Sequence, residues 1–161
     1  MISGSCHCGK SAFRIEAEMP QSLTRCTCSF CSKRGVLWAY FQPAQFHLTS
    51  SADDDATYRW NTKLVPHHFC PVCSCGTFTD SPAFEPDGSW DKHTRRTGVN
   101  ARLFDNFDAV DAHVVVIDGK NLWWPWKAST PCRKSVGLIA EVFRTSLQPY
   151  NAALNKDLSA S

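Results

Sequence analysis

The chain has 161 residues, of which 43% are hydrophobic and 20% charged, and its formal net charge is +2 at pH 7. This length and composition suit one domain with a hydrophobic core and exclude a wholly disordered chain. The net charge is too small to predict a nucleic-acid or membrane partner, and no run of Lys and Arg is longer than two. No apolar run approaches the roughly 20 residues of a membrane-spanning helix.

The N-terminus and the cysteine content indicate the cellular compartment of the protein. The first ten residues, MISGSCHCGK, lack the apolar core of a signal peptide, so we expect a cytoplasmic protein. Nine cysteines are many for such a chain, and thiols at this density in the cytosol more often bind metal than form disulfides. Their C-x-C and C-x2-C spacings also suit a single metal ion. The alternative, a secreted disulfide scaffold, has no export signal to support it.

The first half of the chain predicts short strands. Residues 11–18 alternate between apolar and charged side chains, which indicates a half-buried strand that Pro20 ends. Residues 36–41, VLWAYF, are rich in β-forming types and predict a buried strand, and residues 45–48 predict another after Pro43. Residues 50–55 predict an acidic surface turn.

The middle of the chain continues in the same way. Residues 56–60 and 63–69 predict the two arms of a hairpin that turns at Asn61 and Thr62. Residues 81–98 contain several Pro and Gly residues and predict a loop. Strands are predicted again at 99–103 and 112–117. Up to this point the sequence predicts a mainly β protein.

The character changes beyond residue 123. The segment WWPWKASTPCRK is rich in Trp and Pro, and residues 135–147 carry apolar side chains at helical spacing. We therefore expect a zinc-binding β domain over 1–123 and an appendage over 124–161 with one amphipathic helix at 135–147 and a frayed tail.

Eight of the nine cysteines fall in three dense groups. They are Cys6 and Cys8, then Cys26, Cys28 and Cys31, then Cys70, Cys73 and Cys75. Two C-x-C or C-x2-C pairs brought together make a closed tetrahedral zinc site, and Cys6, Cys8, Cys70 and Cys73 are the natural set. That choice leaves Cys26, Cys28 and Cys31 with an open fourth position, which is the arrangement of a catalytic zinc. In the rival partition Cys75 closes this second site, and both sites are then structural.

The charge of the open site indicates what it could bind. Zinc with three thiolates carries a formal charge of −1, which a fourth thiolate would make −2, and Lys33 and Arg34 directly follow the three cysteines. A metal-bound thiol is deprotonated, so the site could hold the thiolate of an external thiol close to an electrophile.

Three motifs together resemble one known family. The motifs GSCHCG, CTCSFC and HHFCPVCSCGTF, followed by VNARLFD and VVVIDGKNLW, resemble the glutathione-dependent formaldehyde-activating (GFA) enzymes and their relatives, which include centromere protein V. The resemblance runs from about residue 2 to residue 123. It implies a small β-tent of stacked antiparallel sheets with two zinc ions, and the addition of glutathione to formaldehyde, a carbon–sulfur lyase activity that gives S-hydroxymethylglutathione.

The resemblance also implies roles for the cysteines. Cys6, Cys8, Cys70 and Cys73 would bind the structural zinc, and Cys26, Cys28 and Cys31 the catalytic one. This sequence departs from the family at Ser74, where the family usually has Gly after the second Cys of the last motif. Either Ser74 replaces that Gly, or Ser74 and Cys75 are an insertion before Gly76.

Glutathione carries two carboxylates, so its pocket should offer cationic groups. The candidates are Lys33, Arg34, Arg95, Arg96 and Arg102. A proton must also move during the reaction, for which the candidates are His67, His68 and His93, although a structural role fits the first two as well, and His7 is expected to point outward. The competing hypothesis is a non-catalytic, zinc-stabilised module that binds glutathione or a protein.

Overall fold

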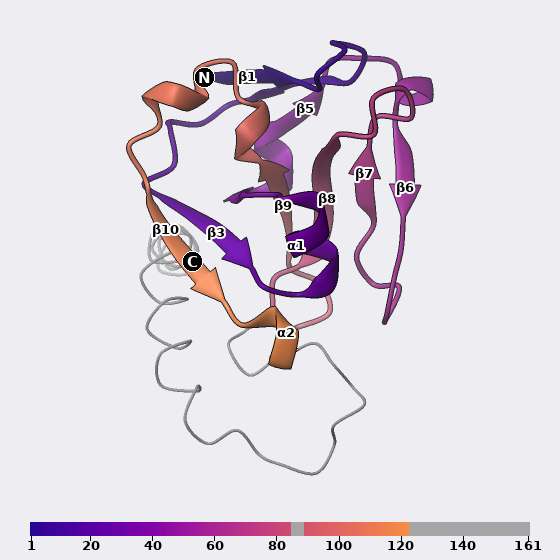
Figure 1. Ribbon diagram of the computed structural model, residues 1–161, viewed down its shortest axis with the longest axis vertical. Coiled ribbons are helices and arrows are strands. Elements are labelled where there is room, and N and C mark those ends of the chain that lie inside the picture. The colour runs from indigo at the N-terminus through magenta and orange to yellow at the C-terminus, as the bar shows by residue number, and fades with distance from the viewer. Residues whose placement is uncertain (85–88, 123–161) are drawn as a thin grey trace, which may run out of the picture. The chain divides into compact units, whose positions relative to one another are not determined.

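The computed structural model of the chain describes residues 1–84 and 89–122 (Figure 1). Apart from Phe84 and Ser89, these residues belong to one compact unit. The predicted boundary after residue 123 and the predicted helix at 135–147 lie outside the described residues. Within the described part of the chain, no helix is long and apolar enough to cross a membrane.

A small antiparallel sheet contains the N-terminal strand. Its strands follow the order β1-β2-β5, and they are β1 (Ile2–Ser5), β2 (Ala12–Ile15) and β5 (Phe46–Leu48). The alternation in residues 11–18 predicts β2 correctly, since Phe13 and Ile15 are buried and Arg14 between them is exposed.

A larger sheet of seven strands follows the order β10-β3-β4-β9-β8-β7-β6. Its strands are β3 (Ser22–Cys26), β4 (Trp38–Phe41), β6 (Ala56–Tyr58), β7 (His67–Phe69), β8 (Gly76–Pro82), β9 (Arg95–Asn100) and β10 (His113–Ile117). The described residues are therefore mainly β, as predicted, and β6 and β7 form the predicted hairpin.

One pair of strands departs from the expected antiparallel sheets. Strand β10 pairs with β3 in parallel, with His113 opposite Ser22 and Ile117 opposite Cys26 (Figure 1). The reason is the route of the chain: β9 ends beside the start of β4, so residues 101–112 must return to the end of the sheet where β3 begins.

Two other predictions are wrong. Residues 81–98 are not one long loop, because β8 extends to Pro82 and β9 begins at Arg95. The strand predicted at 99–103 ends at Asn100, whose side chain accepts a hydrogen bond from the Leu37 backbone and donates one to the Gly76 carbonyl. A 3-10 turn (Ala101–Leu103) follows.

The remaining short elements are α1 (Ser29–Arg34), α2 (Gly119–Leu122) and 3-10 turns at Pro43–Gln45, Ala52–Asp54 and Phe107–Ala109.

Strand β4 separates two clusters of buried side chains. Successive side chains on a strand point to opposite faces. Ala39 and Phe41 belong to the main core, which contains residues of both sheets, and Trp38 belongs to a second cluster with Cys28 and Cys31. The two sheets meet through aromatic rings, since the Phe46 ring of β5 lies 4.6 Å from the Phe78 ring of β8.

A substitution at Gly4 of β1 tests how closely the small sheet packs against the chain segment after β9. A Cβ atom at this position would lie 2.6 Å from Cζ of Phe13 and even closer to the carbonyl oxygen of Leu103. Because backbone cannot yield as a flexible side chain does, we expect Gly4→Ala to lower the free energy of unfolding by about 1–3 kcal/mol. Urea denaturation measures this, and a change within error of wild type would contradict the packing described.

Candidate metal centres

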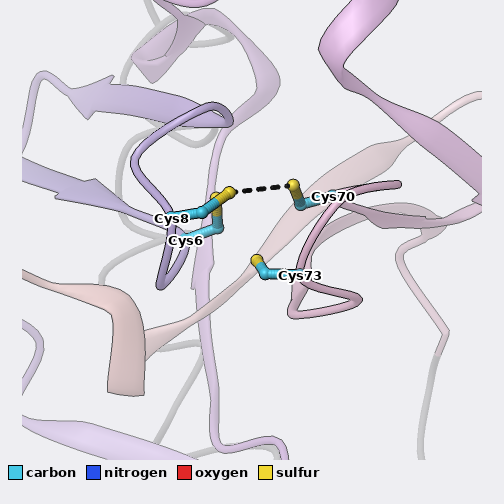
Figure 2. Close-up of side chains that lie close together, drawn as sticks. All are labelled: Cys6, Cys8, Cys70 and Cys73. Carbon is cyan, nitrogen blue, oxygen red and sulfur yellow. Dashed lines mark hydrogen bonds between the residues drawn. The ribbon is translucent and has the colours of Figure 1, made fainter.

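Four cysteines from distant parts of the chain form one group, here called the four-cysteine group (Figure 2). Cys6 and Cys8 lie in the turn between β1 and β2, and Cys70 and Cys73 lie in the turn between β7 and β8. Their sulfur atoms all lie within 4.8 Å of one another. Both turns are tight, since the Gly9 amide donates to the Cys6 carbonyl and the Cys70 amide donates to the Cys75 carbonyl.

The spacing of these sulfurs fits a tetrahedral metal site. The Cys8 sulfur lies 3.6 Å from those of Cys6 and Cys70. Sulfurs bound at about 2.3 Å around a tetrahedral zinc lie about 3.8 Å apart, which is close to this distance. Cys6 and Cys70 are buried, and the Ser11 amide donates a hydrogen bond to the Cys6 sulfur. The four-cysteine group could therefore hold a metal ion.

Three cysteines close together in the sequence form a second group, here called the three-cysteine group. Cys26 ends β3, Cys28 caps the N-terminus of α1, and Cys31 lies within α1. Their sulfurs also lie within 4.8 Å of one another. The segment after β3 forms a short helix, because the Cys28 sulfur accepts a hydrogen bond from the Cys31 amide at its start and Gly35, at φ +64°, ends it.

The three sulfurs of this group share hydrogen bonds and charge. Hydrogen bonds from the Cys26 and Cys31 thiols hold the pKa of Cys28 well below its usual range. The hydrogen bond to Cys28 raises the pKa of Cys26, and hydrogen bonds to Cys26 and Cys28 raise that of Cys31. The three thiols therefore lose their protons as one interacting group. Cys26 is the most accessible of the three, since Cys28 and Cys31 are buried.

Aromatic side chains border the three-cysteine group. Trp38 is buried in the same cluster, and Phe30, Tyr40 and Trp60 pack against it. Burial raises the pKa of Tyr40 to about 12, and this shift is opposed by the Arg96 charge and increased by the charge of the three thiols. Sequence reasoning missed these neighbours, although Trp38 and Tyr40 are two positions apart on a strand, a spacing that places them on one face.

The five candidate cations for glutathione lie in different surroundings. The Arg96 guanidinium is buried and lies 4.2 Å from the centre of the Tyr40 ring, which borders the three-cysteine group. Its neighbour Arg95 pairs with Asp80 on the surface. Arg34 lies over the rings of Phe30 and Phe69, Arg102 donates to the Gly35 carbonyl, and Lys33 is exposed.

The four histidines considered in the sequence analysis also lie in different surroundings. The His67 ring lies 4.2 Å from the Phe30 ring and 6.4 Å from the Trp38 ring, and burial lowers its pKa to about 4, so it is neutral near pH 7. His68 is bonded to Asp55 at 2.5 Å and stacks on Phe78. His93 lies in a turn that Asp91 caps, and His7 is exposed, as expected.

Comparison with known proteins identifies the family of this chain. The family model described as "Glutathione-dependent formaldehyde-activating enzyme" matches residues 1–114. The chain belongs to the GFA family. A Halomonas elongata protein named "Putative glutathione-dependent formaldehyde-activating enzyme" is 46% identical over 90 residues, which cover 51% of this chain and 57% of that protein. The chain thus matches little more than half the length of this relative.

A solved structure shares the fold. The crystal structure of a Rhodobacter sphaeroides protein matches with a TM-score of 0.54 and 23% identity, over 70% of this chain and 99% of that one. At this identity the match supports the fold alone.

The structure also bears on the departure from the GFA pattern at residue 74. Ser74 has φ +62°, in the left-handed region that favours glycine, and its amide donates to the Cys70 carbonyl. The position is therefore the one where a Gly suits the turn, which favours replacement of that Gly by Ser74 over an insertion.

The Cys75 thiol is hydrogen-bonded by the His7 backbone, which lowers its pKa, although burial and the Cys73 thiol raise it overall. Cys75 thus lies beside the four-cysteine group, and its sulfur is in neither group.

Replacing Ser74 tests the strain in this turn. We expect Ser74→Gly to raise the free energy of unfolding by about 1 kcal/mol, because glycine adopts φ +62° without the Cβ clash. Ser74→Ala is the matched control, since it removes the hydroxyl and keeps the clash, and it should give no gain. Thermal unfolding of the metal-loaded protein measures both, and equal effects of the two variants would contradict this account.

Proposed function

We propose that this chain is a zinc-dependent carbon–sulfur lyase that condenses glutathione with formaldehyde, or a related aldehyde, to S-hydroxymethylglutathione. In this proposal the four-cysteine group holds a structural zinc and the three-cysteine group a catalytic one. All-thiolate ligation favours zinc over the other common divalent metals. Membership of the GFA family supports the reaction class.

The observation that carries the proposal is the number of thiols in the second group. Cys26, Cys28 and Cys31 gather without a fourth His, Cys, Asp or Glu ligand among the described residues. Cys75, the competitor for that place, lies on the side of the four-cysteine group. Three protein ligands leave one coordination position for a substrate.

The residues around this group suit a thiol and an aldehyde. A zinc bound there would supply a Lewis acid and lower the pKa of a glutathione thiol. In the reaction a carbon–sulfur bond forms, and the thiol proton ends on the former carbonyl oxygen. His67 is the candidate histidine nearest to the rings that border the group. We therefore propose that the transfer of this proton takes place near the His67 ring. Arg96 is the best-placed cation for a glutathione carboxylate.

The Cys28→Ser variant distinguishes a catalytic metal site at the three-cysteine group from a structural one. Serine is a good N-cap, so the variant should keep α1 while losing a metal ligand. We expect the wild type to bind two zinc ions and Cys28→Ser to bind one and remain folded, with Cys75→Ser, a thiol in neither group, keeping both. Metal analysis and circular dichroism measure these outcomes.

The same variants test catalysis. Exchange spectroscopy by NMR with 13C-formaldehyde and glutathione should show faster interconversion with wild type and Cys75→Ser than without protein, and the background rate with Cys28→Ser. Unfolding of Cys28→Ser would make the second group structural. Glutathione binding without a rate above background would instead favour the non-catalytic module.

Arg95 and Arg96 form a matched pair for the glutathione site. They are adjacent on β9, but only Arg96 is buried beside Tyr40, whereas Arg95 pairs with Asp80. We expect Arg96→Gln to raise the KM for glutathione at least tenfold, the effect of losing one charge-assisted hydrogen bond, and Arg95→Gln to leave it unchanged. Steady-state kinetics measure both, and equal KM values would remove Arg96 from the site.

A further inference from the structure

Each sulfur of the three-cysteine group accepts a hydrogen bond from an N–H group. The Cys28 amide donates to the Cys26 sulfur at 3.5 Å and the Cys31 amide donates to the Cys28 sulfur at 3.4 Å. The Cys31 sulfur accepts from Nε1 of Trp38 at 3.4 Å. Of these three donors, only the indole of Trp38 is a side chain.

The position of Trp38 is set by the sheet and not by the cysteines. It begins β4, with Thr24 of β3 and Asn100 of β9 as its neighbours across the sheet. The residue is 5% exposed. A buried indole N–H must find an acceptor, because leaving it unpaired has a cost in stability. The Cys31 sulfur is that acceptor.

The state of this sulfur decides how strong the bond is. A neutral thiol is a weak acceptor. A metal-bound thiolate carries negative charge, and hydrogen bonds to charged groups are about twice as strong as those between neutral ones. Zinc with three thiolates has a net formal charge of −1 in a largely buried place, so donors directed at the sulfurs stabilise the loaded state more than the empty one.

We propose that Trp38 is a positioning residue of the second metal centre: its indole N–H orients the Cys31 sulfur and withdraws charge from it, which strengthens metal binding and makes the bound metal a better electron acceptor. This inference rests on the proposed metal site. Partners of metal ligands commonly change metal affinity by tenfold to a hundredfold when they are removed, which is about the effect expected here.

The rival explanation is that Trp38 only fills space. Trp60 provides the matched control, because it packs against the same cluster and lies 6.1 Å from the Phe30 ring. Trp38→Phe removes the donor together with some ring volume. Site-specific replacement of Trp38 by 3-benzothienylalanine, which has sulfur in place of the indole N–H, removes the donor and keeps the shape.

The test uses cobalt(II) in place of zinc in the full chain, titrated in competition with a chelator. The spectrum of Cys28→Ser gives the first site alone, and subtracting it isolates the second. We expect both changes at Trp38 to weaken cobalt binding at the second site about tenfold or more and to move the sulfur-to-cobalt charge-transfer band to lower energy, since the Cys31 sulfur becomes richer in electrons. Trp60→Phe should leave both unchanged.

Two results would overturn the inference while the proposed function stands. One is an unchanged spectrum and affinity with benzothienylalanine at position 38, and the other is an equal change in Trp60→Phe. If Trp38→Phe fails to fold, the benzothienylalanine variant alone decides. A wild type that binds a single cobalt ion, with no loss in Cys28→Ser, would instead remove the second metal site and the inference with it.

Discussion

The alternation of side chains along β4 is the constraint on which both the hydrophobic core and the three-cysteine group depend. The strand has a neighbour on each edge, and residues on both of its faces are buried, Trp38 on one and Ala39 and Phe41 on the other. Ala39 and Phe41 must pack against the core shared with the small sheet, and Trp38 must then point to the opposite face. One strand of four residues therefore supports the hydrophobic core on one side and contacts the three-cysteine group on the other.

The two cysteine groups differ in how far along the chain their members lie. Cys8 and Cys70 are 62 residues apart, so closing the four-cysteine group joins the turn after β1 to the turn before β8. A metal bound there would stabilise the fold directly, because the site cannot exist in the unfolded chain. Cys26, Cys28 and Cys31 lie within six residues, so a metal at that group adds little long-range constraint. This difference suits a structural role for the first group and a chemical role for the second.

The sequence predicted strands best where their two faces differ in polarity. β2 was predicted on this basis, and Phe13 and Ile15 on one of its faces are buried while Arg14 on the other is exposed. β8 was missed because Thr77, Thr79 and Ser81 are buried polar residues, which indicate a loop when the sequence is considered alone. β3 was missed because its burial does not alternate, since Leu23 and Thr24 are both buried. In both strands, neighbours from distant segments cover positions that the local pattern predicts to be exposed.

The spacing of the cysteines by itself determined three local groups, because residues two or three positions apart are close together in almost any fold. Only the tertiary structure decided that Cys6 and Cys8 meet Cys70 and Cys73, and that the Cys75 sulfur joins neither group. What surrounds the second group was decided only by the tertiary structure. Arg95 and Arg96 are adjacent in sequence, yet one pairs with Asp80 at the surface and the other lies over Tyr40 beside the thiols. A strand determines that neighbouring side chains take opposite faces, but the pairing of β9 with β4 decides which face meets the cysteines. For the same reason, the contact of Trp38 with Cys31 could be found only in the folded chain.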